Sequence, residues 1–151
     1  MTQVRTKIAV ALLLIHNLQM LLWGLLLTFI PTGVLEVSST SYIGRTWNEI
    51  RVSNIRFTDL VEYYMRFWGI QGTLLAVTFT FIAFTAFLKN EKWSWFSILI
   101  CASIGWGSAI VLDCKLGLSS ILWIDVLPLL FAFASLLVSI RQVFNRKMTN
   151  K

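Results

Sequence analysis

The sequence predicts an all-α membrane protein, a four-transmembrane-helix bundle with both termini in the cytoplasm. Three observations predict this fold class: the composition, four long apolar runs, and basic residues placed between and beyond those runs. Hydrophobic residues make up 57% of the 151 residues and charged residues only 13%, whereas soluble domains carry about 25% charged residues. Because so little polar surface is available to face water, we expect lipid to cover much of this single domain.

Each apolar run is long enough to cross a membrane as a helix, which takes about 20 residues. The first run is too long for a secretory signal, so we expect it to be a retained membrane helix. The first three runs contain no charged residue, and the fourth contains one, Asp125. The predicted helices span about residues 8–30, 59–88, 93–112 and 121–140.

The second helix is predicted to begin before its apolar run, near Asp59. Asp59 followed by Glu62 resembles an N-terminal capping pair, so the first two turns would project above the hydrocarbon. The segment from Pro31 to about Thr58 precedes it. We expect an irregular extracytoplasmic loop there, between the first and second helices.

The distribution of Lys and Arg orients the predicted bundle, because cytoplasmic segments of membrane proteins are enriched in both. With the N-terminus inside, segments 1–7, 89–92 and 141–151 hold eight basic residues and one acid. The outer segments hold five basic residues and six acids. Both termini are therefore predicted to be cytoplasmic. No basic stripe interleaved with aromatic residues exists, so a nucleic-acid partner is not expected.

Small residues recur at helical spacing on two predicted helices. They are Gly69, Thr73 and Ala76 on the second helix and Ser97, Cys101, Gly105 and Ala109 on the third. Small side chains let helix backbones approach closely within a membrane. Because a four-residue turn joins the two helices, we expect these stripes to pack the resulting antiparallel hairpin. The alternative is a docking face for another chain.

Three charged residues are expected to gather near the outer ends of their helices: Arg66, Asp113 and Asp125. A charge at that depth is costly unless it is paired or hydrated. Arg66 could pair with Asp125 or Asp113, and Glu62 also lies one turn before it. The pair could be structural, or it could belong to a pocket for a substrate, a lipid headgroup or a proton. Pro128 follows Asp125 by three residues and frees the carbonyl group of Ile124.

A polar island lies near the middle of the first helix. His16 and Gln19 share one face, and Asn17 points away from it. Hydrogen bonding between helices is the expected use, and contact with a ligand such as a quinone or a lipid carbonyl is the alternative. One histidine gives no basis for a metal site. The sequence indicates no particular cofactor.

Motifs of a stand-alone catalyst are missing from the sequence, including a nucleophile elbow, HExxH, CxxC and a P-loop. Enzymatic activity is therefore disfavoured. One remaining hypothesis is an accessory or structural subunit that packs against other membrane chains or against a second copy. The other is a lipid-, quinone- or small-ligand-binding or transport-like protein whose outer polar pocket contains Arg66, Asp113 and Asp125, with His16 and Gln19 as further candidates.

The order of several sequence features over roughly residues 8–140 is similar to that of a known family. Pro31 ends the first helix, the second opens with the segment EYYMRFWGIQG at residues 62–72, and the third ends in a turn from Asp113 to Gly117. In these features the chain resembles the DoxX-like group of small four-helix membrane proteins. The HNLQ island at residues 16–19 and a charge-rich outer loop depart from the group's pattern. The resemblance implies a membrane-embedded bundle without a well-defined activity.

Overall fold

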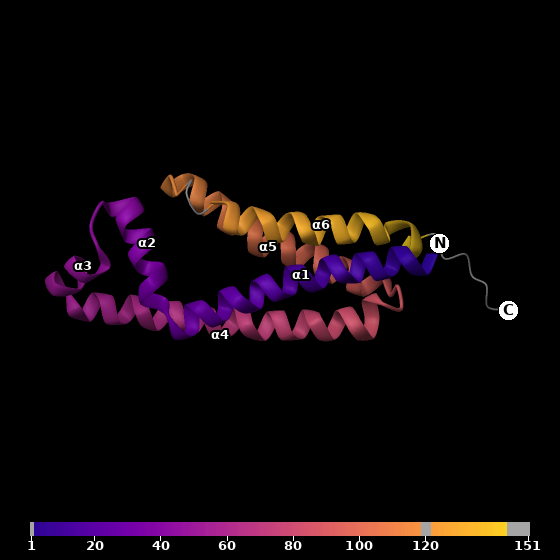
Figure 1. The fold of residues 1–151 in the computed structure, drawn as a ribbon, viewed down its shortest axis with the longest axis horizontal. Coiled ribbons are helices and arrows are strands. Elements are labelled where there is room, and N and C mark those ends of the chain that lie inside the picture. The colour runs from indigo at the N-terminus through magenta and orange to yellow at the C-terminus, as the bar shows by residue number, and fades with distance from the viewer. Residues whose placement is uncertain (1, 119–121, 145–151) are drawn as a thin grey trace.

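The computed structural model describes residues 2–118 and 122–144, which are almost entirely helical (Figure 1). Four of the helical segments are long and apolar enough to cross a membrane, so by length and composition the chain is a multi-pass membrane protein. The predicted all-α class with four spans is thereby confirmed. The described elements are α1 (Thr2–Phe29), α2 (Pro31–Ile43), α3 (Trp47–Ser53), α4 (Ile55–Ile82), the π-helix η1 (Ala83–Phe87), α5 (Lys92–Leu116) and α6 (Leu122–Phe144).

The region between the first two spans is helical, so the expectation of an irregular loop is wrong. Pro31 occupies the first turn of α2, where its missing N–H would have had no partner in any case. Gly44, at φ 71°, ends that helix. At the start of α3 the Thr46 hydroxyl accepts a hydrogen bond from Glu49 N, and the Glu49 carboxylate accepts one from Thr46 N. This reciprocal cap supplies the local signal for α3.

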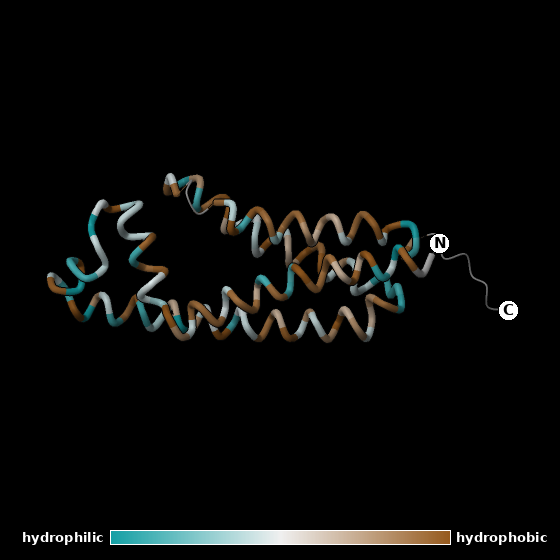
Figure 2. The backbone as a smooth tube through the Cα atoms, in the orientation of Figure 1, coloured by the Kyte–Doolittle hydropathy of each residue, from teal (hydrophilic) through white to brown (hydrophobic). Residues whose placement is uncertain are grey.

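The second span begins at Ile55, one turn before the predicted start near Asp59. Asn54 is the N-cap, and its side-chain oxygen accepts a hydrogen bond from Phe57 N at 3.1 Å, a role that asparagine fills well. The continuous segment Ile55–Phe87 has 33 residues, about 50 Å of helix, which exceeds a hydrocarbon core of about 30 Å. Figure 2 shows that hydrophilic residues gather on this end of α4 and on α3.

The other helix ends also differ from prediction. α5 continues past residue 112 to Leu116, because helix-compatible residues follow until Gly117 adopts φ 69° and ends it. α6 continues through Arg141 to Phe144. The predicted first residue of the fourth helix, Ile121, lies outside the described residues. So do three of the predicted cytoplasmic basic residues, Arg146, Lys147 and Lys151.

α1 is the central helix of the bundle. Its largest contacts are with α4 on one side and with α6 on the other, whereas α5 packs mainly on α6 and touches η1. Neither α5 nor α6 shares a substantial contact with α4. Figure 1 shows α6 and α4 separating toward the end that carries α2 and α3. We refer to that end as the α2–α3 end, and to the opposite end as the terminal end.

The main hydrophobic core lies where α1, the end of α4 with η1, α5 and α6 converge. Two polar contacts reinforce it: the Ser135 hydroxyl donates to the carbonyl of Ala9 at 2.7 Å, and the Trp95 indole N–H donates to that of Leu136 at 3.0 Å. Toward the α2–α3 end, α5 and α6 depend on fewer buried side chains. The core residues are Ala9, Val10, Leu13, Phe79, Ala83, Phe87, Ile98 and Leu136.

Candidate functional site

The small residues of α4 pack against α1. A Cβ atom added to Gly69 would lie 2.5 Å from the backbone nitrogen of Thr28. One added to Gly24 would lie 2.7 Å from the backbone nitrogen of Thr73. Each threonine hydroxyl donates to the carbonyl of the glycine one turn earlier in its own helix. Only glycine permits so close an approach of the two backbones.

This contact, which we call the Gly–Thr crossing (Gly24, Thr28, Gly69 and Thr73), corrects the predicted hairpin packing. The α4 stripe faces α1, with Ala76 also buried, because residues 24 and 28 repeat the glycine-to-threonine spacing of residues 69 and 73. Two matching stripes fit each other. Sequence reasoning missed Gly24 and Thr28, although their four-residue spacing was visible.

The α5 stripe (Ser97, Cys101, Gly105 and Ala109) has no such partner within the described ranges. Cys101 and Gly105 are exposed, and a Cβ atom added to Gly105 would meet nothing within 4 Å. Ser97 and Ala109 are half-buried. Only 17% of the apolar window of α5 is buried, against 28% in each of the other three spans. α5 is therefore the least covered membrane helix of the fold.

The polar island of α1 forms hydrogen bonds with backbone carbonyl groups of α6 at and near Pro128. His16, which is buried, uses Nδ1 to contact the carbonyl oxygen of Pro128 at 2.9 Å. Because a carbonyl only accepts, Nδ1 carries the proton. The Gln19 side chain donates to the carbonyl of Ile124 at 3.3 Å, the group that Pro128 leaves without a helical donor. Both side chains therefore hydrogen-bond between helices, as expected.

Asn17 points to the opposite side of α1 and reaches α4. Its side-chain N–H donates to the hydroxyl of Thr80 at 3.3 Å. Its Oδ1 atom is buried without a hydrogen-bond partner in the described structure. Polar side chains near the middle of α1 thus connect it to both α6 and α4.

An aromatic pocket lies between α1, α5 and α6. It lies closer to the α2–α3 end of the bundle than His16 does. Its volume is about 180 Å³. Trp106 stands edge-on to His16, with ring centroids 6.2 Å apart. Gln19 supplies the polar side chain of an otherwise apolar lining. The lining residues are Gln19, Leu22, Trp23, Leu26, Trp106, Trp123 and Ile124.

Asp113 and Asp125 come together from the end of α5 and the start of α6. Their carboxyl groups lie next to each other, and Oδ2 of Asp113 is buried with no donor from any other described side chain. The sequence prediction placed these two residues in one cluster, and the structure does bring them together.

Arg66 does not join this acid pair, so the predicted ion pair is wrong. Its guanidinium donates to the carbonyl of Thr28 at 2.7 Å. Thr28 lies in the last turn of α1, where carbonyl groups lack helical donors. Arg66 therefore caps α1 from the α4 side, while the two aspartates belong to α5 and α6, which α4 does not substantially contact.

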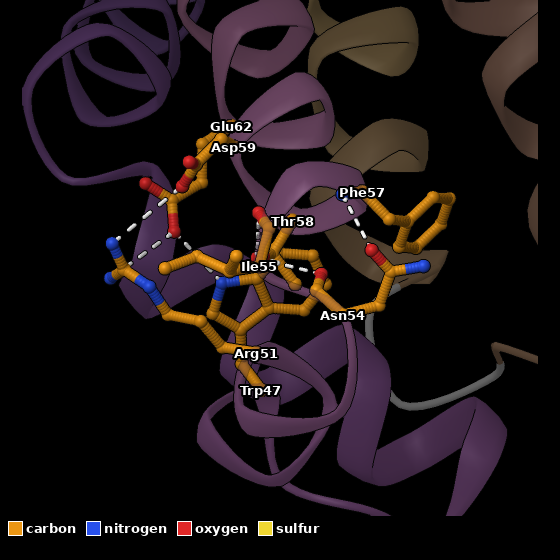
Figure 3. A network of polar contacts seen from close by, with 8 residues as sticks. All are labelled: Trp47, Arg51, Asn54, Ile55, Phe57, Thr58, Asp59 and Glu62. Atoms are coloured by element: carbon orange, nitrogen blue, oxygen red, sulfur yellow. Dashed lines mark hydrogen bonds and ion pairs between the residues drawn. The ribbon is translucent and has the colours of Figure 1, made fainter.

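A second polar cluster, absent from the sequence predictions, joins α3 to α4 (Figure 3). The buried Trp47 indole N–H donates to the Glu62 carboxylate at 3.0 Å. Arg51 lies 3.7 Å from the carboxylate of Asp59 and 3.9 Å from that of Glu62. The backbone N–H of Trp47 also donates to Glu36 of α2 at 2.7 Å. These contacts position α2 and α3 against α4.

Within residues 2–118 and 122–144 no three His, Cys, Asp or Glu side chains are grouped as metal ligands would be. Comparisons with known protein families, with curated proteins and with solved structures each found no match. The site must therefore be interpreted from its own geometry. Three features stand out: the uncovered α5 stripe, the aromatic pocket, and the acid pair of Asp113 and Asp125.

Proposed function

We propose that this chain is an accessory membrane subunit that packs through the α5 stripe against another membrane chain. One observation carries the proposal. Gly69 and Gly105 belong to similar stripes, yet Gly69 is in backbone contact with α1, whereas the space where Gly105 lacks a side chain holds no atom within 4 Å. A second copy of the chain and a different subunit are both possible partners.

Membrane physics explains why this surface supports association. Lipid tails are as apolar as leucine, so apolar area alone gives little drive for helices to associate. Close backbone packing supplies that drive, and it needs small residues on at least one helix. The α5 stripe offers such a surface, and the described part of the chain leaves it open.

Purification from native membranes in a mild detergent tests the proposal. The wild-type chain should migrate as a complex that contains a second membrane chain. Gly105→Leu should reduce that complex to the single chain without loss of folding, because the added side chain fills the approach surface. Ser103→Leu is the matched control, since it places the same bulk on the opposite side of α5. A wild-type chain that purifies alone, or equal behaviour of the two variants, contradicts the proposal.

Cys101 can distinguish the two kinds of partner. Cys101 and Cys114 are both free and exposed, and Cys114→Ser would leave Cys101 as the only thiol. If a second copy packs on the α5 stripe, mild oxidation in membranes should join the two Cys101 side chains as a disulfide-linked dimer. A complex that persists without this cross-link indicates a different subunit.

Orientation is part of the same proposal. Both termini are cytoplasmic, and α2 with α3 is extracytoplasmic, on the strength of the Lys and Arg distribution. A reporter active only in the cytoplasm should be active on either terminus and inactive when inserted at Gly44. The opposite pattern contradicts this orientation. Membership of the DoxX-like group remains a proposal, supported by the segment at residues 62–72 and the turn at Gly117.

The aromatic pocket favours a second candidate function, binding of a quinone, a lipid or another small ligand. Its volume of about 180 Å³ is below the range of about 300–1,000 Å³ usual for drug-sized ligands. It therefore suits one ring or one headgroup. Trp106 and Trp123 supply apolar faces, and Gln19 supplies a polar contact.

Two measurements test this second function. A short-chain benzoquinone should quench the tryptophan fluorescence of the purified chain saturably, and Trp123→Leu should weaken that binding. In cells that lack the wild-type gene, Asp125→Asn and Asp113→Asn should each reduce activity if the acid pair takes part in ligand binding. Linear quenching, together with full activity of both variants, contradicts ligand binding.

A further inference from the structure

Two arginines border one groove at the terminal end, on a surface that the proposed function does not use. Arg5 of α1 and Arg141 of α6 line a groove of about 340 Å³. The rest of its lining is apolar, and Ile8 and Leu137 are both exposed to the surroundings of the bundle. We call this feature the arginine groove. Its residues are Arg5, Ile8, Leu137, Val138, Ile140 and Arg141.

The two arginines lie at similar heights along the bundle. The hydrogen bond from the Ser135 hydroxyl to the carbonyl of Ala9 sets the register of α6 against α1. Arg5 precedes Ala9 by four residues, about 6 Å of helix, and Arg141 follows Ser135 by six residues, about 9 Å. Because the helices are antiparallel, both displacements run toward the terminal end. The two guanidinium groups therefore reach the same level of the groove.

The charge of this pair is not neutralised by the described chain. The ion pairs formed within residues 2–118 and 122–144 belong to Arg51, at the other end of the molecule. No acidic side chain lines the groove. Guanidinium groups are planar donors that bind phosphate with two parallel hydrogen bonds. An anion with several oxygen acceptors is the complementary partner.

We propose that the arginine groove binds an anionic phospholipid. Arg5 and Arg141 contact its phosphate, and an acyl chain lies along Ile8 and Leu137. These two apolar residues belong to the spanning segments Val4–Phe29 and Leu122–Phe144, so the groove runs from the membrane interface into the hydrocarbon. The apolar wall identifies a lipid as the occupant, since a free phosphate ion would not use it. Basic residues at a membrane surface attract anionic headgroups in this way.

Thermal unfolding of the purified full chain in detergent tests the proposal. Phosphatidylglycerol should raise the unfolding temperature more than phosphatidylcholine does at the same mole fraction. Arg5→Gln with Arg141→Gln should weaken the phosphatidylglycerol effect, with an apparent affinity at least about fivefold lower. The matched control is Lys7→Gln with Lys92→Gln, which removes the same charge at the same end. It should change the affinity less than about twofold, because neither lysine lines the groove.

Three results would overturn the proposal. Equal losses in the two double variants would show a general surface field and no defined site. Equal stabilisation by inorganic phosphate would show that the acyl chain contributes nothing. The third result comes from wild-type protein and so does not depend on whether the variants fold. Phosphatidylglycerol with a photoreactive acyl chain should label the peptides containing Ile8 and residues 137–140, and labelling confined to other helices contradicts the site.

Discussion

The α4 and α5 stripes have similar sequences and different surroundings. On α4, Gly69 and Thr73 meet an equivalent pair on α1, and the two backbones come into contact. On α5, Cys101 and Gly105 repeat the four-residue spacing of small residues, but the described chain leaves them uncovered. A stripe of small residues therefore shows only that another helix can approach closely. The partner is decided by where a second, matching stripe lies.

The cost of glycine sharpens this difference. Glycine in a helix interior is less favourable than alanine by roughly 0.5–1 kcal/mol. Gly24 and Gly69 offset that cost through the Gly–Thr crossing within one chain. A Cβ atom added to Gly105 would meet no neighbouring atom within 4 Å, so no close helix approach offsets the cost there. A contact with another chain would account for it.

The largest predicted effect comes from breaking the Gly–Thr crossing. Gly69→Leu should destabilise the folded chain by about 3 kcal/mol or more, because its side chain would overlap the backbone of Thr28. Gly105→Leu should change stability by less than about 0.5 kcal/mol, since open space surrounds that position. Unfolding of both variants in mixed micelles measures the difference. Equal destabilisation would mean that the two stripes are equally packed.

A smaller effect is predicted for Arg66, which extends the α1–α4 contact by capping α1. Arg66→Gln should cost about 1 kcal/mol, because the Thr28 carbonyl loses a charged donor at an exposed site. Asp125→Asn should add to this loss without coupling, since the two side chains do not interact. A double-mutant cycle checks the claim. A coupling energy above about 1 kcal/mol would show that Arg66 and Asp125 do interact, as the sequence predicted, and would contradict the separate placement of the two side chains.

The smallest predicted difference in stability is between variants that each remove one intrahelical hydroxyl group, at Thr73 and at Ser108. Thr73 donates to the carbonyl of Gly69, and Ser108 donates to that of Gly105 at the same 2.9 Å distance. Thr73→Ala should cost about 0.5–1 kcal/mol, because it also removes packing against Gly24. Ser108→Ala should be close to neutral, because its side chain is exposed. Similar costs for both would show that the intrahelical hydrogen bond dominates and the crossing does not.

The spans, the acid pair and the hydrogen-bonding role of the polar island could be predicted from the sequence. Span length follows from the apolar runs, and Pro128 marks the Ile124 carbonyl that Gln19 bonds. The neighbours of each helix could not be predicted this way. Apolar periodicity is nearly uniform around a lipid-facing helix, so it does not say which helix covers which face. The short turn after η1 favoured an α4–α5 hairpin, yet α1 holds the complementary stripe.

The short helices between the first two spans carry capping signals that do not by themselves predict a helix. Asn54, and Thr46 with Glu49, are recognisable N-caps, but the surrounding segment lacks the apolar run that identifies a membrane helix. The contact of Trp47 with Glu62 joins residues from two different helices. Such a contact depends on tertiary placement, which spacing within one helix does not encode.

Native mass spectrometry of particles extracted from membranes with their surrounding lipid gives the most direct test of the proposed subunit role. The wild-type particle should contain this chain together with a second membrane chain, either another copy or a different protein. The Gly105→Leu particle should contain this chain alone, with an unchanged unfolding temperature. A wild-type particle that holds a single chain, or a Gly105→Leu particle that keeps its partner, would contradict the role assigned to the α5 stripe.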